Sequence, residues 1–171
     1  MTMPTLIHPF TDQFNGSALF LNSGPSTGAW PSANRAIYIP FVVSEPCTAV
    51  KMWWLNGTSV SGNVRAAIIR QPDLALLVQT ASTAQSGTSA IQEADITDTL
   101  LSAGIYYAGL ALDNGTGHIL RSLISTTPAY RAAGVAQETL GSLTFPSTIT
   151  PAALTSGQVP MVGISLRTLV A

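Results

Sequence analysis

The two histidines, His8 and His118, are the side chains of this sequence best suited to acid–base or metal chemistry. Neither has another histidine or a cysteine at the spacing of a zinc site, so we expect no bound metal there. A Ser-His-Asp arrangement forms only in space, and a hydrolase of this kind would place an acid and a serine beside His118. The G-x-S-x-G turn that presents a nucleophilic serine is absent. The sequence therefore predicts no enzyme and no cofactor.

Half of the eight acidic residues form a candidate group: Glu93, Asp95 and Asp98 lie within six residues, and Asp113 opens a turn that could bring it near them. Calcium prefers oxygen ligands of this type, which makes a calcium site one reading of the group. The alternative is local: Asp98 can cap a one-turn segment at 98–101, and Asp113 opens an Asp-Asn-Gly turn. We favour the local roles, and we expect no metal.

The three tryptophans could stack on sugar rings or enter a protein interface. Trp53 and Trp54 are adjacent, so in a strand they point to opposite faces. One of them is expected in the core, and the other is expected to face solvent or a partner. Aromatic residues are enriched in interface cores, so for the outward ring we favour a protein partner over a sugar. Trp30 and Trp53 are the predicted interface residues of this type.

The composition points to a surface that is covered by other protein. Charged residues make up 9 % of the chain, against about 25 % in a typical soluble domain, and the net charge is −1. The longest apolar runs, such as 105–112, are far shorter than the ~20 residues of a membrane-spanning helix. The cations are scattered, which argues against nucleic-acid binding. We expect a homo-oligomer or a larger assembly. Cys47 is the only cysteine and is expected to be a small packed residue at the start of a strand.

Short apolar runs alternate with turn signals along residues 52–112, which is typical of an all-β protein. The turns are marked by Asn56-Gly57, Gly62-Asn63, Pro72-Asp73, Gly104 and Asn114-Gly115. Strands are expected at 35–43, 49–55, 63–70, 74–80, 91–96, 105–112, 119–124 and 159–170. Residues 119–124 are the expected hairpin partner of 105–112. This order predicts an antiparallel β-sandwich of the jelly-roll type.

The sandwich is expected to be a single domain over 17–171, preceded by an arm over 1–16. Pro4, Pro9 and Asn15-Gly16 interrupt any regular element in the arm. Its apolar side chains need burial, either on this domain or on a neighbouring subunit, and we predict that they contribute to an interface: Leu6, Ile7, Phe10 and Phe14. Residues 129–143 have near-helical apolar spacing, broken by two glycines, and 145–155 reads as a loop rich in Pro and Thr.

Several segments of the chain share a pattern with one class of viral proteins. They are Trp30-Pro31-Ser32-Ala33-Asn34-Arg35-Ala36-Ile37-Tyr38-Ile39-Pro40-Phe41, Trp54-Leu55-Asn56-Gly57, Ser61-Gly62-Asn63-Val64, Ser86-Gly87-Thr88-Ser89-Ala90-Ile91-Gln92, Asp95-Ile96-Thr97-Asp98-Thr99-Leu100 and Gly104-Ile105-Tyr106-Tyr107. Together they resemble the β-sandwich domains of tailed-bacteriophage virion proteins, found in capsid decoration, head-fibre and tail-associated components.

The resemblance covers residues 30–115 and contains no catalytic signature. It implies a jelly-roll-like module that assembles, often as a trimer, on the outer surface of a phage head. Its partners would be the major capsid protein or other virion proteins, and it would act as a cement or decoration protein. The alternative is a tail- or fibre-associated module that binds a host-surface glycan.

Overall fold

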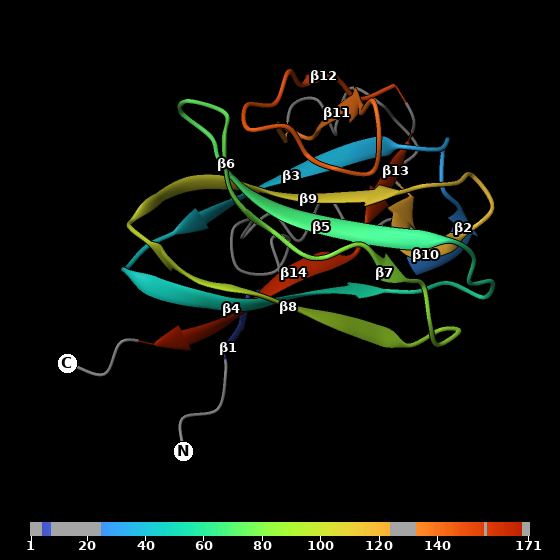
Figure 1. Ribbon diagram of the computed structural model, residues 1–171, viewed down its shortest axis with the longest axis horizontal. Coiled ribbons are helices and arrows are strands. Elements are labelled where there is room, and N and C mark those ends of the chain that lie inside the picture. Colours follow the sequence, from blue (N-terminus) through green and yellow to red (C-terminus); the bar gives the residue numbers. More distant parts are fainter. Residues whose placement is uncertain (1–4, 8–24, 124–132, 156, 169–171) are drawn as a thin grey trace.

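A computed structural model describes residues 5–7, 25–123, 133–155 and 157–168 of the chain (Figure 1). These residues contain fourteen strands, joined by loops, and no helix. The strands are β1 (Thr5–Ile7), β2 (Pro25–Ala29), β3 (Arg35–Val43), β4 (Cys47–Leu55), β5 (Asn63–Arg70), β6 (Ala75–Gln79), β7 (Thr83–Ala84), β8 (Ile91–Leu101), β9 (Gly104–Leu112), β10 (His118–Leu123), β11 (Ala136–Thr139), β12 (Ala152–Ala153), β13 (Gln158–Pro160) and β14 (Val162–Thr168).

The strands form two large antiparallel sheets that face each other and a small third sheet (Figure 1). The four-stranded sheet has the order β1-β14-β4-β8. The larger sheet has the order β12-β11-β3-β9-β5-β6, and β7 also pairs with β5. The small sheet has the order β13-β10-β2. The predicted all-β antiparallel sandwich is therefore confirmed, while the jelly-roll connectivity stays a prediction.

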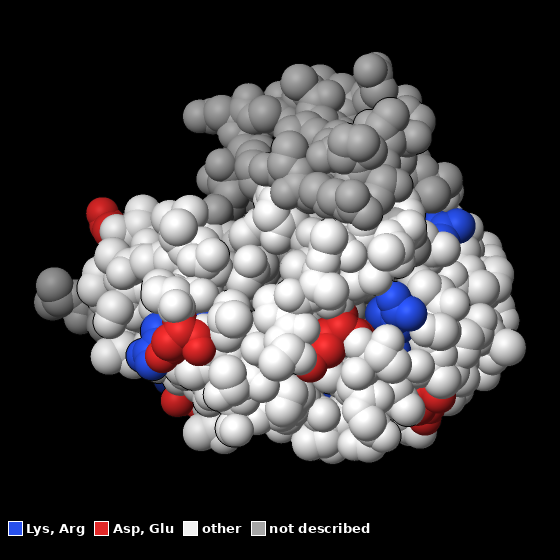
Figure 2. Space-filling model, turned by 90° about the horizontal axis from the view of Figure 1, so that it is seen from above, with Lys and Arg blue, Asp and Glu red and all other residues white. Residues whose placement is uncertain are grey.

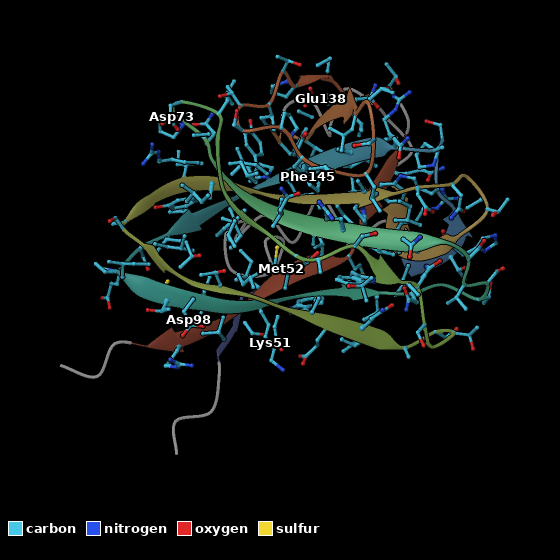
Figure 3. All side chains as sticks on the ribbon, in the orientation of Figure 1. Lys51, Met52, Asp73, Asp98, Glu138 and Phe145 are labelled. Atoms are coloured by element: carbon cyan, nitrogen blue, oxygen red, sulfur yellow. The ribbon has the colours of Figure 1, made fainter. Side chains whose placement is uncertain are left out.

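The main core lies between the two large sheets and follows from the two-residue period of the strands. Ile37, Ile39 and Phe41 of β3 point inward, and Met52 and Trp54 of β4 meet them from the opposite sheet; none of the five is measurably exposed. Figure 3 shows Met52 and Lys51 on opposite sides of β4. Burial of such side chains contributes about 1.5–3 kcal/mol each, which makes this core the main source of stability.

A second apolar cluster covers the outer face of the larger sheet. It joins Tyr38 of β3, Ile69 of β5 and Tyr107 of β9 to Phe145 and Ile149. The last two belong to residues 140–154, which we call the covering segment (Figure 3). Its backbone is tied to the sheet where the Leu76 amide donates to Ser147 O at 2.9 Å and the Ile149 amide donates to Leu74 O at 3.0 Å. The loop predicted here is thus a packed layer.

Two local predictions are wrong, those for residues 98–101 and for the partner of 119–124. Residues 98–101 are part of β8, so Asp98 caps no helical turn. The described part of 129–143, whose apolar spacing is near-helical, contains the strand β11, which pairs with β3. β10 pairs with β2 and β13. It has no place beside β9, because β9 already lies between β3 and β5.

Candidate functional site

The predicted interface tryptophans are buried within the chain. Trp30 is 3 % exposed, and its indole N–H donates to Arg35 O at 2.8 Å. Trp54 belongs to the main core, as the alternation predicts, but Trp53 on the other side of β4 is only 7 % exposed. The expected exposure of Trp53 is therefore wrong. Alternation along a strand decides which face a side chain takes, and it says nothing about what covers that face.

The burial extends to every aromatic side chain that the structure describes. Each of the eight is at most 8 % exposed: Trp30, Tyr38, Phe41, Trp53, Trp54, Tyr106, Tyr107 and Phe145. A ring that stacks on a sugar must present one face to solvent. The described residues therefore offer no stacking platform for a glycan.

The predicted arm contributes one strand to the fold. Leu6 and Ile7 lie in β1, which pairs with β14 at one edge of the four-stranded sheet. Phe10 and Phe14 lie outside the described residues, as does most of the predicted arm over 1–16. The arm was expected to pack either on its own domain or on a neighbouring subunit. The pairing of β1 with β14 places this part of the arm on its own domain.

The opposite edge of the same sheet presents exposed aliphatic side chains. β8 lies at this edge, with Ile91 near one end and Leu100 near the other, 60 % and 61 % exposed. Carboxylates lie between them. We call the set the β8 stripe, and its members are Ile91, Glu93, Asp95, Asp98 and Leu100.

The charges of the β8 stripe are compensated by the neighbouring strands. The Lys51 ammonium of β4 lies 3.6 Å from both the Glu93 and the Asp95 carboxylates, so two anions share one cation. Arg167 of β14 donates to Asp98 at 3.1 Å. These pairs are solvent-exposed, so each contributes little to stability. Because three carboxylates are paired with two cations, the middle of the β8 stripe keeps a small net negative charge, and an apolar side chain lies at each end of it.

The carboxylates that could serve as calcium ligands do not converge in the described part of the chain. Glu93, Asp95 and Asp98 are engaged by cations, and Asp113 lies apart from them, after β9. The Asp113 carboxylate accepts the Asn63 amide at 2.9 Å and the Asn63 and Asn114 side-chain amides at 2.7 and 2.8 Å. Burial opposes its ionisation, but these donors outweigh burial and lower the pKa of Asp113 below its usual range. N–H groups occupy the positions that a cation would need.

His118 lies in an exposed hydroxyl cluster. Its Nδ1 is 3.3 Å from Thr27 Oγ1 and 3.4 Å from Thr58 Oγ1, and the two hydroxyl oxygens are 3.0 Å apart. Within the described residues, these two hydroxyls are the hydrogen-bond partners of its ring, and neither a carboxylate nor a serine hydroxyl bonds to the ring there. No group of three or more His, Cys, Asp or Glu side chains in this part of the chain could hold a metal ion.

A buried amide network determines the shape of the loops near His118. Asn56 has no measurable exposure, and its amide donates to Ser86 O at 2.6 Å and to Gln92 Oε1 at 2.9 Å. Gln85 donates to Asn56 Oδ1 at 3.1 Å and to His118 O at 2.7 Å. The network satisfies polar groups that burial would otherwise penalise. It is structural, and it keeps the Asn56-Gly57 turn against β10.

Sequence reasoning missed the exposed aliphatic residues. Besides Ile91 and Leu100, the cross-strand neighbours Val42 and Ile105 are each 45 % exposed at the end of the larger sheet. One signal for Ile91 was present: its position two residues before Glu93 and four before Asp95 places an apolar side chain on a charged strand face. No comparable signal marks Val42, because β3 is apolar on both faces.

Comparison with protein-family models and with curated proteins finds no match for this chain. In the residues that the structure describes, nothing forms a helix with the length and apolarity needed to cross a membrane.

Proposed function

We propose that this protein is a non-enzymatic virion structural protein, and specifically a cement or decoration protein that binds the shell of a phage head as an oligomer. The observation that carries the proposal is that the protein has few charged side chains and that several of them are paired with each other within the chain. The resemblance of residues 30–115 to phage β-sandwich modules supplies the biological context, and a trimer is the favoured oligomer.

Several of the few charged groups are already paired within the chain. Lys51, Arg70 and Arg167 each contact at least one carboxylate. Glu138 accepts the Tyr38 hydroxyl at 2.9 Å and the Thr150 hydroxyl at 2.7 Å. Figure 2 shows one face, where a few small groups of charged side chains are set in a largely uncharged surface. Such a surface has little field to attract a charged ligand, and it loses little hydration when another protein covers it.

The β8 stripe supports contact with a protein partner. Interfaces combine apolar anchors with polar groups that remain hydrated at the rim. Ile91 and Leu100 supply two anchors on one strand, and the carboxylates between them keep ion-pair partners in the unbound chain. We assign the stripe to the contact with the shell protein.

The alternative, a tail- or fibre-associated module that binds a host glycan, has weaker support. Its strongest argument was an exposed tryptophan, and Trp30 and Trp53 are buried. Polar side chains such as Thr27, Thr58 and His118 could still contact a sugar by hydrogen bonds. A glycan array with the purified chain, repeated with Trp53→Ala, tests this alternative directly.

The main test measures binding to phage heads that lack the protein. Wild-type chain is mixed with such heads, and its occupancy is measured by sedimentation and gel densitometry. We expect saturable binding that is lost when Ile91→Asp and Leu100→Asp are combined. Val42→Asp is the matched control, because Val42 is exposed on the other large sheet and should leave occupancy unchanged. Wild-type chain that fails to bind heads, together with glycan binding on the array, would replace the proposal with the alternative.

The arm has its own test. Deletion of residues 1–14 should abolish attachment to the shell while the rest of the domain still folds. Unchanged occupancy of the deleted chain on heads would contradict the prediction that the arm contributes to the interface with the shell.

A further inference from the structure

The edge of the four-stranded sheet formed by β14 is closed by a strand from a distant part of the chain. β1 pairs with β14 through Thr5 opposite Leu166, Leu6 opposite Ser165 and Ile7 opposite Ile164. An uncovered edge strand presents free N–H and C=O groups that pair with any available strand. The β14 edge is therefore a site that accepts a short extended segment, and β1 is the segment that fits it.

The length of chain behind β1 decides how far that segment can reach. Residues 8–24 join β1 to β2, which belongs to the small sheet and not to the sheet that β1 completes. Fully extended, these residues span at most roughly 55–60 Å. A compact domain of 171 residues is about 40 Å across. The connection is long enough for β1 to reach the β14 edge of a copy lying alongside.

β1 can pair with β14 of its own chain or with β14 of a neighbouring copy. The two pairings have nearly equal energies, because the same three residue pairs form in both. The choice then depends on local concentration. A tether of this kind holds β1 near its own β14 at an effective concentration of order 1 mM, so pairing within the chain dominates in dilute solution. Copies packed side by side reach comparable local concentrations. The net charge of −1 adds little repulsion between them.

We propose that β14 of one copy accepts β1 of a neighbouring copy when the protein is assembled, so that the four-stranded sheet is completed by exchange. This proposal rests on the proposed function, because a particle surface is what brings copies together at high density. Exchange of a terminal element costs few contacts and links copies through backbone hydrogen bonds. It gives an assembly a connection that no single exposed side chain provides.

The test uses disulfide cross-linking in a Cys47→Ala background. One chain carries Leu6→Cys, and a second chain of different mass carries Ser165→Cys, at positions that face each other in the register. The two are refolded together, bound to heads or concentrated, oxidised, and separated without reductant. We expect a disulfide-linked mixed dimer. While only a small fraction of the chains has exchanged β1, its yield should rise about tenfold for each tenfold rise in protein concentration, by mass action. The yield on heads should exceed that in dilute solution.

A matched pair on strands that cannot exchange controls for random collision. Lys51→Cys and Asp95→Cys lie opposite each other across β4 and β8, in the body of the same sheet. When these two variants are on separate chains, they should give only the small amount of mixed disulfide that random collision between chains produces. A yield for the Leu6 and Ser165 variants no higher than that of this control, both in concentrated solution and on heads, overturns the exchange.

The two proposals fail separately. Binding to heads without a mixed dimer overturns the exchange and leaves the proposed function intact. A mixed dimer in concentrated solution with no binding to heads supports the β14 edge as an acceptor and overturns the cement role.

Discussion

Gly109 in β9 allows the covering segment to approach the larger sheet, and replacing it tests that packing. A Cβ at Gly109 would lie 3.0 Å from Phe145 Cε1 and 3.2 Å from two ring carbons of Tyr38. Both rings are buried, with centroids 6.1 Å apart, so neither can turn away freely. We predict that Gly109→Ala destabilises the protein by about 1–3 kcal/mol, the usual cost of one extra methyl in a packed core.

A double variant shows whether the cost comes from Phe145. Phe145→Ala alone should cost about 3–5 kcal/mol through the cavity it leaves. Combined with Gly109→Ala, the total should fall below the sum of the two, because the new methyl then enters space that the ring has left. Urea unfolding followed by tryptophan fluorescence measures each variant. In a domain of this size each kcal/mol also lowers Tm by about 2–4 °C.

Gly141 is the matched control within the covering segment, since a Cβ there meets nothing within 4 Å. Gly141→Ala should change the free energy of unfolding by no more than about 0.5 kcal/mol. Two results would refute the reasoning: Gly109→Ala as mild as Gly141→Ala, or additive effects of Gly109→Ala and Phe145→Ala to within about 0.5 kcal/mol.

Three further predictions concern single groups. Burial, reinforced by a hydrogen bond to the Glu138 carboxylate, raises the pKa of Tyr38 above its usual range. The stability that the neutral Tyr38 hydroxyl contributes is therefore complete below the unfolded-state pKa of about 10, and it is lost as the pH rises beyond that value. Urea unfolding at pH 8 and pH 11 should therefore show a smaller alkaline loss for Tyr38→Phe than for wild type, and an equal loss would contradict this. The hydrogen bond from Arg70 lowers the pKa of Asp73 to about 2, so any stability from this pair is present above the unfolded-state pKa and is lost as pH falls toward 2. An NMR titration of the carboxyl carbon should move its midpoint up toward 3.8 in Arg70→Gln, and an unmoved midpoint would show that Arg70 is not the cause. Gly62 has φ +67°, and a Cβ there would clash with Asn114 Nδ2. Gly62→Ala should therefore destabilise the protein by more than the ~1–2 kcal/mol of the backbone strain alone, as measured by chemical unfolding.

The strands that sequence predicts best are those bounded by turn residues on both sides. β5 was predicted at 63–70, between Gly62 and the Pro72-Asp73 turn, and its bounds agree with the structure. β3, at 35–43, agrees as well. In these segments the β-branched residues and the turn chemistry point to the same answer locally, so no tertiary information is needed.

The parts that sequence did not predict depend on contacts between distant segments. The partner of β10 follows from which strand edges are already occupied, and a sequence pattern does not contain that information. The burial of Trp53 and the packing of Phe145 are of the same kind, because each depends on what covers the outer face of a sheet. The candidate surface was missed for the converse reason: Ile91 and Leu100 are ordinary strand residues until their edge position is known.

The charged edge at β8 limits how copies of this protein can grow into larger structures. If two copies paired antiparallel through β8 with these residues in register, two stripes would face each other, each with three carboxylates and two paired cations. Their residual negative charges would disfavour the strand pair. The register between β4 and β8 also shifts between Ala49 and Lys51, which bends the edge away from a straight ladder. The strand at the opposite edge is β1, which has only three residues and so offers little backbone to a partner strand. Growth of the four-stranded sheet into a fibre is therefore disfavoured at both of its edges.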